Sequence, residues 1–391
     1  MRSFLNNTWR VLCRELGRMT ELRLPLVLLF VLPTAAFICF AFLFRNSISS
    51  MPVAVLDEDR TPLSRKLVTM VGDTPTARVA YDIPDMEEGM HLMRQGKIYA
   101  ILQIPSGFEK DLLGGRPVPV EFYNSGANIS VNGLLARDVQ TAVTTFSTGV
   151  QLQMLEAKGL TERQAMAQAR PVTFDKHIMF NPFVNYAYYL APSMLVMMLL
   201  IFTVLATVYA VGTEMKYATA REWLETAGGS VVAAVTGKML PVTAVMSLMM
   251  MVMYAVVFLV VGAPLNGSVV MLVVSALVFV LSYQAIGVFV AVLFANLRLG
   301  LSFGGGYSVL AFTFSGLTFP TMAMYGAMRV FSYLFPFTFY MQIYVDIAMR
   351  GTPWYYALPD LGWMLAFQLL PIAVLPRLRR ICTDEKYWGR M

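Results

Sequence analysis

The chain has 391 residues, of which 57% are hydrophobic and only 14% are charged. A soluble domain cannot bury so much apolar surface, so the composition excludes a soluble globular protein and predicts one that crosses a membrane several times. The formal net charge of +6 comes from Lys and Arg residues beside the apolar runs, which is the bias of loops on the inner membrane face and does not indicate nucleic-acid binding.

Residues 1–23 are predicted to form an amphipathic helix on the cytoplasmic side. An apolar set recurs at helical spacing, namely Leu5, Trp9, Leu12, Leu16 and Met19. A basic set recurs at every fourth residue, namely Arg10, Arg14 and Arg18. At about 100° per residue the two sets point in opposite directions, which is typical of a helix that lies in the membrane interface. The pattern leaves two roles open, a simple anchor and a contact with a cytoplasmic partner.

The fold class predicted from the apolar runs is an α-helical membrane protein with six transmembrane helices. The runs without Lys, Arg, Asp or Glu are 24–44, 187–211, 239–261, 269–294 and 299–320. Each is long enough to cross a hydrocarbon core of about 30 Å. The sixth run, Leu361–Leu375, is shorter but extends upstream through Trp354. Spans two to six therefore fall within residues 183–376, and the Arg and Lys residues before span one and in the 377–391 tail place both termini in the cytoplasm.

Residues 45–182 form the one large polar segment, which we expect to be an extracytoplasmic α/β domain between spans one and two. Strands are predicted at 52–57, 77–82, 98–104 and 118–123, and helices at 61–71, 84–95, 105–113, 128–158 and 161–169. Asp57, Glu58 and Asp59 lie at a strand-to-helix turn, where acids cap the following helix. His91 and His177 each stand without a second metal ligand nearby in the sequence, so no metal site is expected.

The stretch 212–238 places charged residues between two apolar runs and ends in Gly237 and Lys238. A phosphate-binding loop needs a Gly where the chain has Val232 and a Ser or Thr where it has Met239. We therefore expect that the chain does not hydrolyse ATP and holds no cofactor.

The part of this stretch at 215–229, MKYATAREWLETAGG, predicts a short amphipathic helix instead. Arg221 and Glu225 stand four residues apart, as in a helical ion pair, and Gly228 and Gly229 would end the helix. On these grounds alone, an ordinary connecting loop with Trp223 at the membrane interface stays an open alternative.

The fifth apolar run is predicted to be broken. Pro320 ends it, Pro336 falls inside the next apolar run and Arg329 lies between them, so part of the chain is expected to re-enter the membrane from outside. Broken helices of this kind often mark transport paths, although kinks with only a packing role are also common.

The order of these segments resembles the type 2 ABC exporter permeases, in particular the subgroup with a large extracytoplasmic domain between spans one and two. The resemblance covers nearly the whole chain and rests on VAVLDEDRTPLSRKL, GTEMKYATAREWLETAGGS, SGLTFP, FPFTFY and IYVDIAMRG. One departure is Ala218, which stands where many relatives place Gly. In that family the charged stretch is a coupling helix, near 214–228 here, that docks on a separately encoded ATPase subunit.

The resemblance also implies site residues and partners. The contact surface for the ATPase, which would itself hold ATP and Mg²⁺, would consist of Glu214, Lys216, Thr219, Arg221, Glu222, Trp223 and Leu224. A second permease chain, identical or paralogous, would face the first, with spans two and five lining the path. The candidates for the lining near the outer gate are Phe312, Ser315, Phe319 and Pro320. The outer domain would meet a membrane-fusion adaptor and an outer-membrane channel.

The function predicted from residues and resemblance together is the membrane subunit of an ATP-driven exporter in a bacterial inner membrane. It would not be an enzyme itself, and it would move a hydrophobic or amphipathic compound, drug-like or lipid-like, out of the cell. Spans one to five contain no Asp or Glu, which argues against a proton-coupled carrier. The alternative is a non-transporting sensor or envelope assembly factor whose outer domain binds a ligand.

Overall fold

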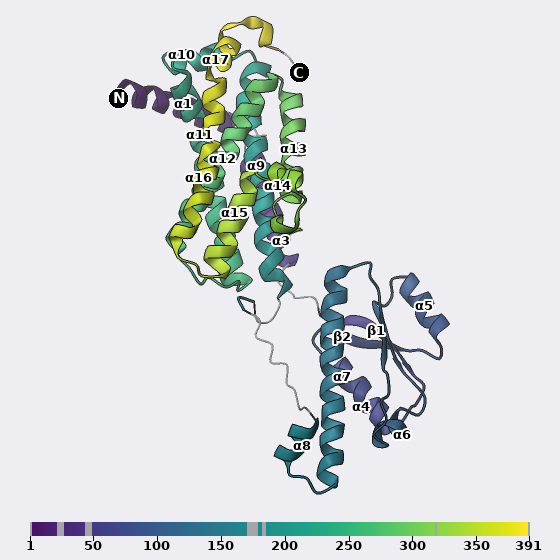
Figure 1. The fold of residues 1–391 in the computed structure, drawn as a ribbon. Coiled ribbons are helices and arrows are strands. Elements are labelled where there is room, and N and C mark those ends of the chain that lie inside the picture. The colour runs from purple at the N-terminus through teal and green to yellow at the C-terminus, as the bar shows by residue number, and fades with distance from the viewer. Residues whose placement is uncertain are drawn as a thin grey trace. The chain divides into compact units, whose positions relative to one another are not determined.

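The computed structural model describes residues 2–21, 27–43, 49–169, 179–181, 185–316 and 319–389. The chain divides into two compact units, a helical unit formed by Met1–Arg45 with Ile178–Met391 and an α/β unit formed by Asn46–His177 (Figure 1). Each unit has its own hydrophobic core. The domain boundaries predicted near residues 44 and 182, and His177, lie outside the described residues.

The helical unit contains long helices joined by short turns. Its helices are α1 (Arg2–Glu21), α3 (Leu32–Leu43), α9 (Tyr186–Lys216), α10 (Ala220–Thr226), α11 (Val231–Ala255), α12 (Val269–Phe294), α13 (Leu297–Thr313), α14 (Gly326–Ser332), α15 (Pro336–Tyr344), α16 (Leu358–Ala366) and α17 (Leu369–Thr383). Shorter π and 3₁₀ segments are η1 (Val27–Val31), η2 (Val256–Val260), η3 (Thr321–Ala323), η4 (Val345–Met349), η5 (Trp354–Ala357) and η6 (Glu385–Tyr387).

Four stretches of the described residues are helical, long and apolar enough to cross a membrane. They are Leu190–Lys216, Val231–Val260, Val269–Phe294 and Trp354–Thr383, and they coincide with the second, third, fourth and sixth predicted spans. A shorter apolar helix, Leu29–Phe40, falls in the first predicted span. Every side of a helix that spans a membrane meets either another helix or lipid. These segments therefore have no polar face. The chain is therefore a mostly helical membrane protein.

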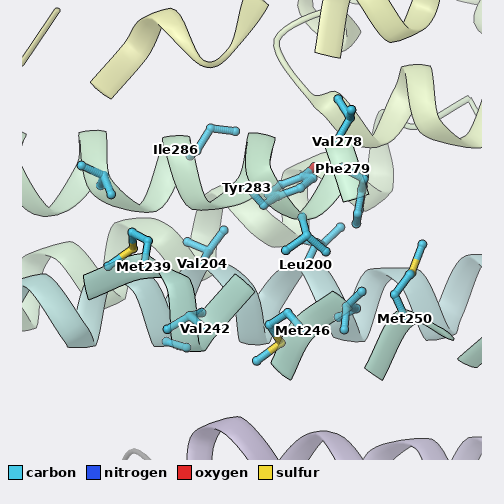
Figure 2. Packing of buried hydrophobic residues seen from close by; sticks show 14 of the residues in the cluster. Leu200, Val204, Met239, Val242, Met246, Met250, Val278, Phe279, Tyr283 and Ile286 are labelled. Carbon is cyan, nitrogen blue, oxygen red and sulfur yellow. The ribbon is translucent and has the colours of Figure 1, made fainter. Parts of the chain in front are cut away.

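Helix α9 forms the centre of the helical unit and packs against α3, α11, α12 and α13. Figure 2 shows the core between α9, α11 and α12, where Leu200 and Val204 lie near Met246 and Tyr283. Glycine allows α13 to approach α9 closely, because a Cβ on Gly304 would lie only 2.9 Å from the Val204 side chain of α9. Small residues at such contacts let helix backbones approach, which is how helices gain dispersion energy in a membrane.

The fifth predicted span is broken. Helix α13 ends at Thr313, well before Pro320. After α14 the chain comes back to the level of Tyr307 on α13, where the Tyr307 hydroxyl donates a hydrogen bond to the Leu334 carbonyl oxygen at 2.7 Å. Pro336 does not interrupt a helix, as its place inside an apolar run suggested, but stands in the first turn of α15, where its missing N–H costs nothing.

The α/β unit is built on one sheet with strand order β2-β1-β3-β4. Its elements are β1 (Met51–Asp57), α4 (Pro62–Gly72), β2 (Ala77–Asp82), α5 (Met86–Arg94), β3 (Ala100–Ile104), α6 (Phe108–Leu113), β4 (Glu121–Asn124), α7 (Ile129–Ala157) and α8 (Glu162–Ala169). Strand β1 is parallel to β2 and β3, and β4 is antiparallel to β3. Alternating residues of β1 serve opposite faces, so Val53 and Val55 pack with α4 and α7 while Ala54 and Leu56 pack with α5.

The acids at the end of β1 cap a helix other than the one expected. Thr61 is the N-cap of the following helix, α4. Asp59 instead accepts hydrogen bonds from the backbone amides of Gly107 and Glu109, at 2.8 and 3.0 Å, at the start of α6. Burial opposes the charge of Asp59, but the hydrogen bonds from Thr61 and from the backbone amides outweigh it and hold the pKa of Asp59 below its usual value. His91 lies exposed on α5.

Asp59→Ala should destabilise the α/β unit by about 1 kcal/mol, because the first amides of α6 lose their acceptor. The measurement is hydrogen exchange at the amides of Gly107 and Glu109 in the intact chain. The pKa of Asp59 in the folded state lies below the unfolded value of about 4. The contribution of Asp59 to the stability of the α/β unit is therefore present above about pH 4 and is lost as the pH falls through the lowered pKa. Glu58→Ala, at an exposed neighbour, is the control; equal exchange in the two variants would contradict the role of Asp59.

Candidate functional site

The charged stretch forms a short helix at one end of the helical unit, where the N-terminal helix and the C-terminal residues also gather (Figure 1). The helix is shorter than the predicted 215–229, because α9 continues to Lys216 and α10 begins only at Ala220. Ala218 in the turn between them has a φ of 57°. This left-handed conformation costs an L-residue about 1–2 kcal/mol and suits glycine, the residue expected here from the family resemblance.

The end of α10 and its surface ion pair agree with the prediction. Arg221 donates to Glu225 at 3.1 Å, one turn further along the helix. Gly228 and Gly229 have φ values of 63° and 77°, and the Gly229 amide donates to the Leu224 carbonyl oxygen at 2.9 Å. This is the arrangement in which glycines close a helix by a backbone turn.

A buried carboxylate lies directly behind α10. Glu214, in the last turn of α9, is fully buried. It accepts hydrogen bonds from Arg14 at 2.8 and 3.1 Å, from Arg18, and from Lys238 at 2.6 Å. We call Arg14, Glu15, Arg18, Glu214 and Lys238 the Glu214 cluster. Its members come from α1, α9 and α11, so one set of charges joins three helices that are far apart in the sequence.

Lys238, the lysine of the apparent phosphate-loop ending, belongs to this cluster. It stands within α11 with 1% of its side chain exposed and pairs with both Glu214 and Glu15. Its ammonium group also lies 5.1 Å from the centre of the Trp223 ring, as in a cation–π contact. The lysine therefore has a structural role in the helical unit.

The charges of the cluster satisfy one another. A buried charge without a partner is very unfavourable, whereas a buried group whose hydrogen bonds are all met is tolerated. Burial of Arg14 works against its charge, but the hydrogen bond and the charge of Glu214 outweigh it and raise the pKa of Arg14 above its ordinary value. Arg14 thus stays charged and paired with Glu214 at neutral pH.

The predicted contact surface divides into a buried and an exposed part. Trp223 is 1% exposed, and its indole N–H donates to the Ala234 carbonyl oxygen of α11 at 3.2 Å. Leu224 and Glu214 are also buried, which departs from the expectation that these side chains are available to a partner. Arg221 and Glu222 are each 67% exposed. Lys216 and Thr219 are half-buried beside them.

Helix α1 packs on α11 with Arg14 and Arg18 turned inward, while Arg10 is exposed. A Cβ on Gly237 would lie 2.6 Å from the Thr8 carbonyl oxygen, so the two helices touch through backbone. Arg14 and Arg18 point to Glu214, whereas Trp9 is 62% exposed. The helical pattern of α1 predicts a two-sided helix, but the inward face carries Thr8, Val11 and Glu15 together with Arg14 and Arg18, whereas Arg10 of the basic set is exposed.

The four residues proposed for the transport path lie close in sequence around the end of α13 but not in one cavity. Ser315 and Pro320 line a small cavity of about 250 Å³ together with Asp346 and Arg350. The Ser315 hydroxyl donates to the Phe312 carbonyl oxygen at 2.8 Å. Phe312 is half-buried, and Phe319 is 53% exposed; neither is among the residues that line this cavity.

Sequence reasoning missed Lys238 and Glu15 as members of the site. The signal in the sequence that could have indicated them was a lone charged residue near the end of an apolar helix. Glu214 and Lys238 each stand at the margin of a run that is otherwise uncharged, and such charges are expected to find a partner inside the bundle. Helix periodicity gives no information about which charges on separate helices will meet.

The long apolar helices with a short charged helix fixed at one end define a membrane protein, and the comparison with known families gives its class. The family model described as ABC-2 family transporter protein matches residues 25–375 of the chain. The chain belongs to this family, as its resemblance to type 2 ABC permeases suggested. It is thus an ABC transporter membrane permease and by family not itself an ATPase. No curated protein matches the chain significantly.

Glu214→Gln should lower the stability of the helical unit by about 3–5 kcal/mol, because the neutral amide leaves buried cations without their shared partner. The change is read as a lower thermal denaturation temperature of the purified permease in nanodiscs.

The matched control for this variant is Glu225→Gln. Glu225 and its partner Arg221 are each 67% exposed, and such a surface pair contributes about 1 kcal/mol or less. If the two Gln variants denature at the same temperature, the Glu214 cluster is not a principal source of stability.

Proposed function

We propose that the chain is the membrane subunit of an ATP-driven exporter that moves a hydrophobic or amphipathic compound out of the cell. Permeases of this family pair with ATPase subunits. The observation that carries the proposal for this chain is α10, a short helix that exposes Arg221, Glu222 and Glu225 while Trp223 and the Glu214 cluster fasten its other face to the bundle. Family membership favours this function over a sensor or an assembly factor.

In this proposal α10 is the coupling helix. Arg221, Glu222, Lys216 and Thr219 contact a dimer of ATPase subunits, which holds ATP and Mg²⁺. The buried residues Glu214, Trp223 and Leu224 have a different role, which is to hold α10 against the bundle. A movement imposed on α10 then acts on α9 and α11 directly, because Trp223 is hydrogen-bonded to α11 and Glu214 lies on α9.

The topology proposed with this function has six transmembrane helices and both termini in the cytoplasm of a bacterial inner membrane. Basic residues support it, since Arg14, Lys216 and Arg221 belong to the end of the helical unit that carries α10. The loop at 262–268, which contains no charged residue, would face outward. The α/β unit, inserted between the first two spans, would be extracytoplasmic and meet a membrane-fusion adaptor and an outer-membrane channel.

The transport path in this proposal lies between two permease chains, identical or paralogous, with α9 and α13 facing it. The return of the chain through α14 beside α13 would make the fifth span re-entrant. Phe312, Ser315, Phe319 and Pro320 would lie near the outer gate. Irregular backbone at membrane depth needs cover from protein or a water-filled cavity, and the cavity lined by Ser315 and Pro320 is such a place.

Arg221→Glu should weaken binding of the cognate ATPase about tenfold or more, because it reverses an exposed charge at the proposed contact. The measurement is the dissociation constant of the permease and the purified ATPase in nanodiscs, with the thermal denaturation temperature of the permease measured alongside.

Arg65→Glu is the control for this prediction, since it reverses an exposed charge on α4 of the α/β unit. Unaltered ATPase binding by Arg221→Glu would remove α10 from the contact surface.

Phe319→Trp should change the efflux rate or the resistance conferred by the transporter several-fold while the complex with the ATPase assembles normally, since a larger ring would narrow the path. Tyr325→Trp, at a residue 82% exposed in the same segment, is the matched enlargement outside the proposed lining. Wild-type efflux from Phe319→Trp would exclude this residue from the path.

A further inference from the structure

Helix α10 is small for the role that it has in the proposed function. It has seven residues, of which Ala220, Trp223 and Leu224 are buried. A specific protein interface takes about 800 Å² and about 20–30 residues from each partner. The remaining side chains of α10 provide only a fraction of that surface. A contact with the ATPase must therefore continue onto parts of the helical unit that adjoin α10.

The end of α17 is one of these parts, because it packs against α10 (Figure 1). Two hydrogen bonds show that α12 runs parallel to α16 and α17. The Ser282 hydroxyl donates to the Met364 carbonyl oxygen at 2.9 Å, and the Arg377 guanidinium donates to the Leu293 carbonyl oxygen at 2.8 Å. Leu293 is in the last turn of α12, whereas α17 continues from Arg377 to Thr383, which at 1.5 Å per residue adds about 9 Å. The last turn of α17 therefore projects past the end of α12.

The residues after α17 are fixed against the end of α9. The Gly389 amide donates to the Met215 carbonyl oxygen at 3.0 Å. The Trp388 indole N–H donates to the Ile381 carbonyl oxygen of α17, also at 3.0 Å. Met215 directly precedes Lys216, which the proposed function assigns to the ATPase contact. Residues 379–389, which we call the 379–389 segment, thus form an ordered surface that adjoins this contact.

The outward side of the 379–389 segment is basic. Arg379 and Arg380 are exposed. Lys386 is 59% exposed, and its partner Asp384 at 3.1 Å is itself 44% exposed, so solvent weakens this ion pair and leaves the ammonium group accessible. Exposed cations at the edge of a contact fit acidic side chains on a soluble partner.

Helix α1 also packs against α10, but its outward side has a different chemistry. Leu5, Trp9 and Leu16 are 59%, 62% and 49% exposed there. An apolar outward side of this kind is typical of a helix in the membrane interface. The 379–389 segment is the neighbour of α10 whose exposed charges match the surface of a soluble protein.

We propose that the 379–389 segment is a second contact surface for the ATPase, on which Arg379, Arg380 and Lys386 pair with acidic side chains of that subunit. This inference rests on the proposed function, because it takes α10 as the first contact. The ATPase then touches α10 and the end of α17 together, and the area that α10 lacks comes from the segment beside it. Charges at the edge of an interface act mainly on the rate of association and on its dependence on salt.

The experiment uses the full chain in nanodiscs and the purified cognate ATPase, and it measures the association rate and the dissociation constant at two salt concentrations. The double variant Arg379→Glu/Arg380→Glu should weaken binding about tenfold and reduce the salt dependence of the association rate. Lys386→Glu should cause a smaller loss in the same direction. Arg65→Glu, on the α/β unit, is the control and should bind as the wild type does, and the thermal denaturation temperature of each variant checks its fold.

The lipid composition separates the ATPase from the membrane as the partner of these cations, since basic residues beside a span also meet anionic headgroups. Each variant is measured in nanodiscs of phosphatidylcholine alone and with added phosphatidylglycerol. A loss of binding that occurs only with phosphatidylglycerol would overturn the proposal in favour of a lipid contact.

Arg221→Glu, measured on the same samples, tests the proposed function separately. Weaker binding by Arg221→Glu, together with unaltered binding by both segment variants, would remove the 379–389 segment from the contact and leave α10 in it. Unaltered binding by all three variants would remove α10 as well.

Discussion

The ion pairs of Glu214 determine how the end of the helical unit that carries α10 is assembled. A carboxylate with no exposed surface is unstable in an apolar bundle unless cations reach it, and here they come from two other helices: Arg14 and Arg18 from α1 and Lys238 from α11. This requirement fixes the rotation of α1, which must present Arg14 and Arg18 to the bundle and leave Trp9 outside. It also fixes the direction of α10, because Lys238 lies against the Trp223 ring.

In the proposed coupling role, this arrangement separates the residues that a partner would touch from those that would transmit its movement. The exposed side chains of α10 can form a contact, whereas Trp223 and Leu224 hold the helix to α11 and its neighbours. A short surface helix would otherwise be free to shift without effect on the bundle. Because its inner face is joined to both α9 and α11, the two helices that flank it in sequence, a displacement of α10 has a direct structural route into the spans.

The broken span depends on different forces from the Glu214 cluster. There the chain leaves the helical path at Thr313, and the freed backbone is satisfied by local groups, such as the Tyr307 hydroxyl on the Leu334 carbonyl oxygen. Aromatic rings fill the surroundings, with Phe314 and Phe331 packed edge to face at 5.0 Å between centres. One end of the unit is thus held by ion pairs, and the break by aromatic rings and by hydrogen bonds to backbone carbonyl oxygens, including two from Arg329, so the two can be altered independently.

The sequence by itself determined the membrane class, most of the apolar spans and the strands and helices of the α/β unit, because these follow from apolar periods, turn residues and charge spacing along one segment. It offered α10 beside the alternative of an ordinary connecting loop. The same local reasoning predicted a break at Pro320, whereas α13 already ends at Thr313. Only the tertiary structure decided that Lys238 meets Glu214, that Asp59 caps α6 and not α4, and that Trp223 is buried. These contacts join segments whose side chains carry no mark of their partner, since a hydrogen bond or an ion pair depends on where two elements come to lie in space.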